Sequence, residues 1–104
     1  KGVELLVLPE AAVTGYDVSS VLNALPHQLR EAEKLICEAC RRHSLAAIVG
    51  SPYYDLEGNG YNTAILIGPD GEVIGRQHKL QLVPPDWSWS RPGQNLNVFR
   101  VLGV

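Results

Sequence analysis

The sequence has little excess charge, few cysteines and no long apolar run. Its 104 residues carry 9 basic and 11 acidic side chains, for a formal net charge of −2. This near balance means that the sequence has no excess of basic residues that would attract nucleic acid or an anionic membrane surface. No apolar run approaches the roughly 20 residues that cross a bilayer. Glu4 interrupts the first apolar segment, which does not read as a signal peptide. We therefore expect no nucleic-acid partner and no membrane partner.

The only two cysteines, Cys37 and Cys40, form a CxxC pair. A thioredoxin-like redox pair needs this motif at the start of a helix that follows a strand. Here the motif lies inside a helical pattern, and a zinc site would need a second pair of ligands. We interpret both cysteines as structural thiols and expect no metal or cofactor. Reduced thiols of this kind fit a cytoplasmic setting.

The length and the pattern at the start of the chain favour one α/β unit. A chain of 104 residues with 45% hydrophobic side chains can bury one modest core. The short apolar run Val3–Leu8 predicts a strand buried on both faces. Apolar side chains then recur at helical spacing from Pro26 to His43, with basic residues at the end that complement the helix dipole.

The rest of the chain predicts a sheet with short connections. Further strands are expected over Leu45–Val49, Asn62–Ile67, Glu72–Leu82 and Asn97–Leu102. Gly68-Pro69-Asp70-Gly71 is a turn signal that joins the second and third of these as a hairpin. Residues 10–25 and 84–93 are expected to be loops. The order strand, helix, strand, hairpin, strand predicts an α/β layered sheet that starts and stops mid-domain.

Glu10 is the first residue that can carry chemistry. It follows the first predicted strand directly and opens a loop, a position where open α/β sheets place catalytic groups. A carboxylate fixed there suits general-base catalysis. Judged from position alone, an ordinary loop carboxylate is the commoner interpretation.

Lys79 lies near the end of the strand predicted over Glu72–Leu82. A solvated lysine at a strand edge is the commoner case, but a fixed cation beside a carboxylate would stabilise the oxyanion formed in acyl transfer. His78 has no GxSxG partner motif and is interpreted as a packing histidine. Gly58 and Gly60 make only a GxG, so we do not expect phosphate binding.

Taken in order, these segments resemble the nitrilase superfamily of carbon–nitrogen hydrolases. Glu4–Asp17 (ELLVLPEAAVTGYD) is similar to the family's strand-PE-TGY signature. Ala46–Pro52 (AAIVGSP) resembles the strand after the family's first complete helix, and Gly60–Ile67 (GYNTAILI) its YN-T/S-A hairpin. Gly75–Leu82 (GRQHKLQL) resembles its R-x-K-x-H-L strand, and Arg91-Pro92-Gly93 the approach to its nucleophile strand. Each motif is weak alone, but the ordered set covers the whole chain.

The resemblance implies a partial αββα sandwich in which residues 1–104 are one part of a carbon–nitrogen hydrolase domain. It implies hydrolysis of a non-peptide C–N bond in a small amide, nitrile or carbamoyl substrate. Glu10 would be the general base and Lys79 the cation of a Glu-Lys-Cys site. Tyr16 and Asp86 are the residues that it implies for substrate binding. Family members usually dimerise through their helices, so a homo-oligomer is expected.

The nucleophilic cysteine is expected shortly after Val104, because Cys37 and Cys40 map to the helix. The 104-residue chain alone is therefore expected to be inactive. Two departures from the family pattern stand near Lys79: Gln81 takes the place of the usual histidine, and Asp86 is shorter than the family's second Glu. The glutaminase domain of an NAD-synthetase-like enzyme and a non-catalytic binding module are the alternative interpretations.

Overall fold

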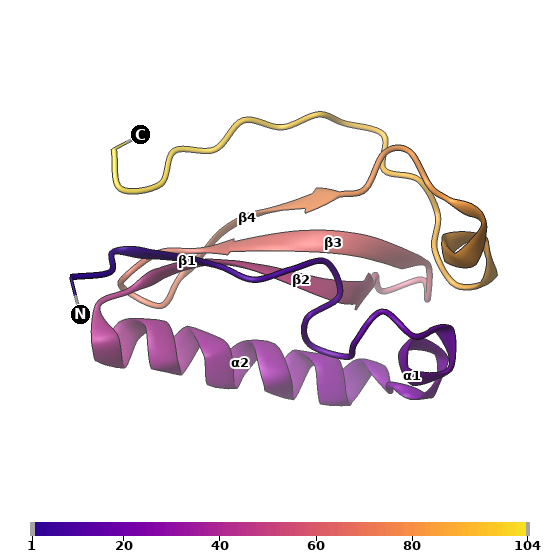
Figure 1. Cartoon of the computed structure of the whole chain (residues 1–104), viewed down its shortest axis with the longest axis horizontal. Coiled ribbons are helices and arrows are strands. Elements are labelled where there is room, and N and C mark those ends of the chain that lie inside the picture. Colours follow the sequence, from indigo (N-terminus) through magenta and orange to yellow (C-terminus); the bar gives the residue numbers. More distant parts are fainter. Residues whose placement is uncertain (1, 104) are drawn as a thin grey trace.

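The computed structural model describes residues 2–103 and shows a sheet covered on one face by a long helix (Figure 1). The sheet has four strands in the spatial order β1-β2-β3-β4: β1 (Leu5–Val7), β2 (Ala46–Tyr54), β3 (Gly60–Ile67) and β4 (Val73–His78). β1 pairs with β2 in parallel, and the other pairs are antiparallel. The mixed α/β class expected from the sequence is confirmed.

Within residues 2–103, three helical segments complete the fold. They are α1 (Val18–Asn23), α2 (Pro26–His43) and the 3-10 helix η1 (Pro84–Ser88). α2 begins where the sequence predicts, with the backbone N–H of Leu25 donating to the Gln28 side chain at 2.9 Å. It ends at His43, and the next residue, Ser44, has a left-handed φ of 49° that turns the chain into β2.

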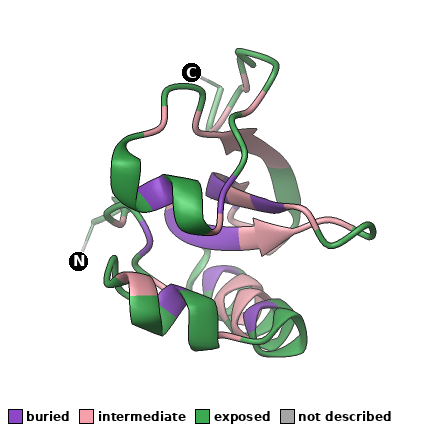
Figure 2. Cartoon of the chain, turned by 90° about the vertical axis from the view of Figure 1, so that its right-hand side faces the viewer, coloured by how far each residue is buried: buried purple, intermediate pink, exposed green. Residues whose placement is uncertain are grey.

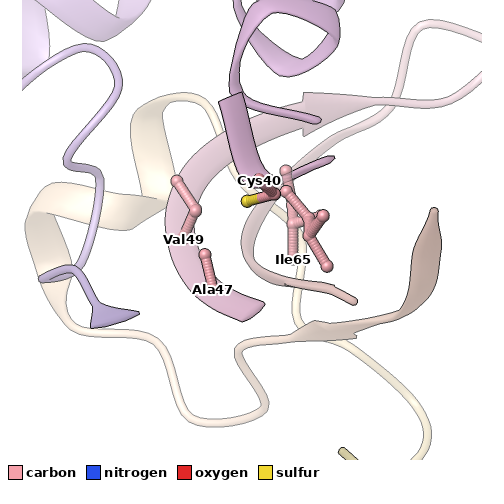
Figure 3. Packing of buried hydrophobic residues seen from close by; sticks show 5 residues of the cluster. Cys40, Ala47, Val49 and Ile65 are labelled. Atoms are coloured by element: carbon pink, nitrogen blue, oxygen red, sulfur yellow. The ribbon is translucent and has the colours of Figure 1, made fainter. Parts of the chain in front are cut away.

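The core lies between α2 and the sheet (Figure 3). Alternate residues of β2 and β3 point to this side, because successive side chains of a strand point to opposite faces. They pack with a thiol of the helix in one cluster: Cys40, Ala47, Val49, Ile65 and Ile67. Burial raises the pKa of both the Cys40 and the Cys37 thiol, which agrees with a structural role.

The other face of the sheet is only partly covered. Figure 2 shows the buried parts of β2 and β3 between the helix layer on one side and η1 on the other. η1 lies at one end of this face, while the chain after it runs back along β4 (Figure 1). Part of the sheet surface on this side therefore remains accessible, and the candidate site lies there.

Five expectations about elements were wrong. Residues 84–93 were expected to be a loop, but they contain η1, and the strand expected over Glu72–Leu82 ends at His78. Val3–Leu8 was expected to be buried on both faces, but β1 is an edge strand whose side chains are 39–62% exposed. Residues 10–25 were expected to be a loop, but they contain α1, which Asp17 caps by accepting from the backbone N–H of Ser20. No strand forms over Asn97–Leu102, because in residues 2–103 no further strand pairs with this segment.

Candidate active site

The loop after β1 places Glu10 beside the face of the sheet that α2 does not cover. The backbone N–H of Leu8 donates to the Ile48 carbonyl at 2.8 Å, and that of Val13 to the Gly50 carbonyl at 3.2 Å. Gly50 allows this close approach, since a Cβ there would collide with the backbone of residues 9–11. The position of Glu10 is thus fixed by β2 underneath it.

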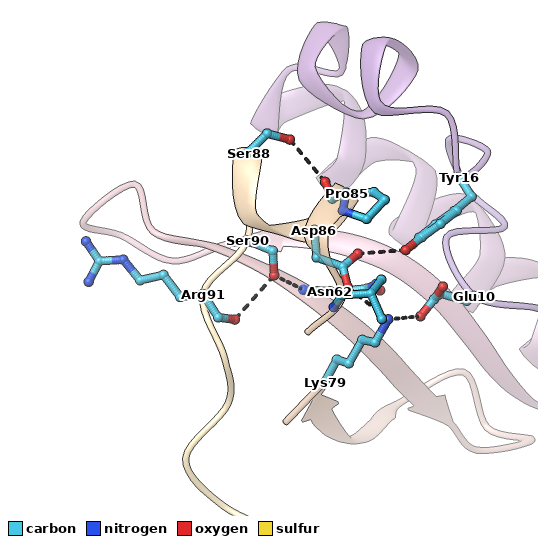
Figure 4. Close-up of polar contacts among 10 residues, drawn as sticks. Glu10, Tyr16, Asn62, Lys79, Pro85, Asp86, Ser88, Ser90 and Arg91 are labelled. Atoms are coloured by element: carbon cyan, nitrogen blue, oxygen red, sulfur yellow. Dashed lines mark hydrogen bonds and ion pairs between the residues drawn. The ribbon is translucent and has the colours of Figure 1, made fainter. Parts of the chain in front are cut away.

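Lys79 is the first residue beyond the end of β4. Its backbone N–H donates to the Asn62 carbonyl of β3 at 2.7 Å, and its carbonyl accepts from the N–H of Gly93 at 2.9 Å. The backbone of Lys79 is therefore held on both sides. Its side chain leaves the sheet on the face opposite α2, in the direction of Glu10 (Figure 4).

The Lys79 ammonium pairs with two carboxylates (Figure 4). Nζ lies 2.9 Å from Glu10 Oε1 and 2.9 Å from Asp86 Oδ2. Asp86 Oδ2 also accepts the backbone N–H of Val83 at 3.0 Å, and Asp86 Oδ1 accepts the Tyr16 hydroxyl at 2.9 Å. The four residues that the sequence singled out as site residues therefore form one connected network.

Burial and pairing determine the charges in this network. Burial lowers the pKa of Lys79, but its bonds to Asp86 and Glu10 outweigh that effect and hold it above the ordinary value. Burial raises the pKa of Asp86, but the N–H of Val83, Lys79 and Tyr16 together hold it below the ordinary value. The network therefore contains a lysine cation and a buried aspartate anion at neutral pH.

A cavity of about 300 Å³ opens in front of this network, on the face of the sheet opposite α2. Its lining is mostly apolar or uncharged, with Glu10 and Lys79 as its two charged residues: Leu8, Glu10, Ile48, Gly50, Asn62, Thr63, Ala64, Gln77 and Lys79. A carboxylate and an ammonium at the wall of such a cavity can exchange a proton with a bound group and stabilise a developing negative charge.

Tyr16 and Asp86 lie behind Lys79 and do not line the cavity. The Asp86 side chain is fully buried. The expectation that these two residues contact substrate stays a prediction. Cys37 and Cys40 lie on α2, on the other side of the sheet, so neither faces Glu10 or Lys79.

Sequence reasoning missed two polar residues of the cavity, Asn62 and Gln77. Asn62 is 3% exposed, and its side-chain nitrogen has no hydrogen-bond partner within residues 2–103. Gln77 donates to the Asn95 carbonyl at 2.8 Å and accepts from the backbone N–H of Asn97 at 2.8 Å. The alternation of side chains along each strand could have identified them, because in this pairing register both point to the cavity side of the sheet.

Residues 2–103 contain no group of three or more His, Cys, Asp or Glu side chains that could hold a metal ion. Within the same range, none of the helices has the length and apolar character needed to span a bilayer.

The fold is that of the nitrilase-superfamily amidases. A structure of the amidase from Nesterenkonia sp. AN1 in complex with butyramide superposes with a TM-score of 0.82 at 28% identity, over 90% of this chain and 37% of that one. The chain belongs to the carbon-nitrogen hydrolase family, whose sequence model matches residues 1–100. The family expected from the ordered motifs is therefore confirmed.

Two curated relatives are amidases. The chain is 28% identical over 90 residues to the protein N-terminal amidase of Saccharomyces cerevisiae, covering 83% of this chain and 20% of that protein. It is 27% identical over 82 residues to the 2-oxoglutaramate amidase of Bacillus subtilis, covering 79% of this chain and 32% of that protein. The chain thus spans a fifth to a third of the length of these relatives.

Proposed function

We propose that this chain forms part of an amidase in which Glu10 is the general base and Lys79 stabilises the oxyanion. One observation carries the proposal: the Glu10–Lys79 ion pair of 2.9 Å at the wall of a cavity. The family and the amidase relatives support the reaction class. A third group, a thiol nucleophile, completes the chemistry of the site.

The proposed first half-reaction makes a thioester. The Glu10 carboxylate takes the proton of the thiol, and the thiolate attacks the amide carbonyl carbon. The carbonyl oxygen becomes an oxyanion, which Lys79 stabilises through an N–H that is not used by Glu10 or Asp86. Glu10 then gives its proton to the departing nitrogen, the C–N bond breaks, and ammonia or an amine leaves.

The proposed second half-reaction regenerates the enzyme. Glu10 takes a proton from water, and the resulting hydroxide attacks the thioester carbonyl. The C–S bond breaks, the thiol recovers its proton from Glu10, and a carboxylic acid leaves. Neither Cys37 nor Cys40 can serve as this thiol, because the sheet separates both from Glu10. We therefore assign the nucleophile to a residue outside positions 1–104, and the 104-residue chain alone should not hydrolyse amides.

Small amides are the substrates that we infer. The amidase from Nesterenkonia sp. AN1 binds butyramide in one structure, and in another its active-site cysteine carries added acrylamide. A cavity of about 300 Å³ suits an acyl group of that size. With a nitrile, the thiolate would add to the carbon to form a thioimidate, which adds water and loses ammonia to give the same thioester. A carbamoyl compound would lose its amine and form a thiocarbamate, which water then hydrolyses. A homo-oligomer in the cytoplasm is the assembly and location that we propose.

The test is ammonia release by the full-length protein from butyramide, 2-oxoglutaramate and butyronitrile. We expect release from at least one amide and a loss of roughly 10²–10³-fold in Lys79→Met, the range for removing one oxyanion donor. Lys34→Met, a change on the solvent side of α2, should leave the rate unchanged. Full activity in Lys79→Met would contradict the role of Lys79. Inactivity of the folded wild type on every substrate would favour a non-catalytic binding module.

A further inference from the structure

We propose that Tyr16 is a positioning residue of the site, whose hydroxyl holds Asp86 so that Asp86 holds the Lys79 ammonium in place. This inference rests on the proposed function and gives Tyr16 a role other than contact with substrate. It comes from the hydrogen bonds of the buried Asp86 carboxylate, whose two oxygens accept from three donors.

The two oxygens of Asp86 have different partners (Figure 4). Oδ2 accepts from Lys79 Nζ at 2.9 Å and from the backbone N–H of Val83 at 3.0 Å. Oδ1 accepts from the Tyr16 hydroxyl at 2.9 Å. Because the Asp86 side chain is fully buried, bulk water cannot replace a lost donor. Without the Tyr16 hydroxyl, Oδ1 would be a buried charged oxygen without its donor, which is strongly unfavourable.

The Tyr16 hydroxyl therefore fixes the orientation of the carboxylate. An aspartate that is held at one oxygen only can rotate about its last torsion, which is a soft one. Held at both oxygens, it keeps Oδ2 directed at Lys79. The ammonium has three N–H groups; one faces Glu10 and one faces Asp86. One N–H then remains for a substrate oxygen in the cavity.

Tyr16 contacts the network from behind and not through the cavity. Its ring centroid lies 5.9 Å from Lys79 Nζ, within the range of a weak cation–π contact. It does not belong to the cavity lining, although Glu10 and Lys79 both do. A residue placed in this way acts on the reaction through Asp86 and Lys79.

The titration of Tyr16 reports this contact directly. Three charged groups face its hydroxyl: Asp86 from η1, Lys79 from the end of β4 and Glu10 from the loop after β1. The hydrogen bond to Asp86 is the main reason why the pKa of Tyr16 lies above its ordinary value, Glu10 adds to the effect and Lys79 opposes it. The hydroxyl thus stays a proton donor at neutral pH.

The kinetic test uses the full-length protein with Tyr16→Phe, which removes only the hydroxyl. We expect kcat to fall about 10-fold, the scale of a hydrogen bond to a charged group, with KM unchanged. In an Asp86→Asn background the same change should have little further effect, because the two residues act as a unit. Tyr61→Phe, which alters a ring stacked on His78 at 4.3 Å, is the matched control and should leave kcat unchanged.

A rise in KM with kcat unchanged would overturn the proposal, because it would place Tyr16 in contact with substrate. Additive effects of Tyr16→Phe and Asp86→Asn would overturn it as well. A second measurement does not depend on activity: NMR titration of ¹³Cζ-labelled tyrosine, with the Tyr16 signal assigned through Tyr16→Phe. We expect the pKa of Tyr16 to fall in Asp86→Asn. An unchanged pKa would refute the coupling even if no substrate is found, whereas an inactive wild type would refute the proposed function alone.

Discussion

At the scale of single residues, Asp86 is the group on which the geometry of the site depends most. It is fully buried, and it is joined to Lys79, Tyr16 and Val83 at 2.9–3.0 Å. Burial of an ion is unfavourable unless its hydrogen bonds are complete. This carboxylate meets that condition with three donors, and we expect its removal to weaken the fold as well as the site.

Asp86→Asn should lower the free energy of unfolding by about 1–3 kcal/mol near neutral pH, since it leaves buried donors poorly matched. The folded-state pKa of Asp86 lies below its ordinary value, so its contribution is present above the unfolded pKa of about 4 and is lost as the pH falls through the folded value. Urea unfolding at pH 7 and at pH 3 should show a smaller difference between wild type and variant at pH 3.

Glu31→Gln, a change on the exposed side of α2, is the control for that comparison and should change stability little at either pH. An equal difference between wild type and Asp86→Asn at both pH values would contradict the account of this carboxylate.

Single residues also show which parts of the site could be predicted. Glu10 and Lys79 were found because each stands in a motif that resembles the family's, and the structure brings them to 2.9 Å. The role of Gly50 was not predictable, because the loop that lies against it is brought there by tertiary structure. Tyr16 and Asp86 are 70 positions apart in the sequence, so no local sequence pattern could predict their contact.

At the scale of elements, β2 positions the loop that carries Glu10 through Gly50. Gly50→Ala would place a methyl group against the backbone of residues 9–11, so the loop with Glu10 must move. We expect a loss of about 1–3 kcal/mol in stability, as for an overpacked site, together with a lower rate of amide hydrolysis. Gly68→Ala is the milder control, since its methyl meets only side-chain atoms of Asp70 and Ile74. Equal effects of the two changes would contradict this role.

The helix α2 carries thiols that we expect to take no part in the chemistry. In the full-length protein, the double change Cys37→Ala and Cys40→Ala should preserve the rate of ammonia release, because both sulfurs lie across the sheet from Glu10. Cys40 packs in the core, so some loss of stability is expected, and unfolding curves separate that loss from an effect on rate. Loss of activity in a folded double variant would contradict the assignment of the nucleophile.

Elements differ in how far their sequence determined them. Pro26–His43 was predicted because the apolar residues of an amphipathic helix recur in the sequence at the spacing of the helical turn. The burial of Val3–Leu8 was predicted wrongly, since an apolar run does not show whether its strand lies at the centre or at the edge of a sheet. Asn97–Leu102 has the composition of a strand, but in residues 2–103 the Gln77 side chain contacts the start of this segment and no ladder forms. Exposure and pairing depend on partners, which a local pattern does not contain.

At the scale of the whole molecule, the sheet has one face that α2 covers and one face that is partly open. α2 and the core lie on one side of the sheet, while Glu10, Lys79 and the cavity lie on the other. We expect this division to separate stability from chemistry: changes in the core cluster should affect the site little, whereas changes at Gly50 or Asp86 should affect both. It also leaves both free thiols, Cys37 and Cys40, on the other side of the sheet from Glu10.

The central claim is that Glu10 acts as the base of an amide-hydrolysing site. The most direct test is ammonia release by the full-length protein in wild type and in Glu10→Gln, with Glu4→Gln as the matched control. We predict a loss of about 10²–10⁴-fold in Glu10→Gln, the range for general-base catalysis, with an unchanged circular dichroism spectrum. Glu4→Gln should retain the rate of the wild type. An active wild type whose rate survives in Glu10→Gln would contradict the account.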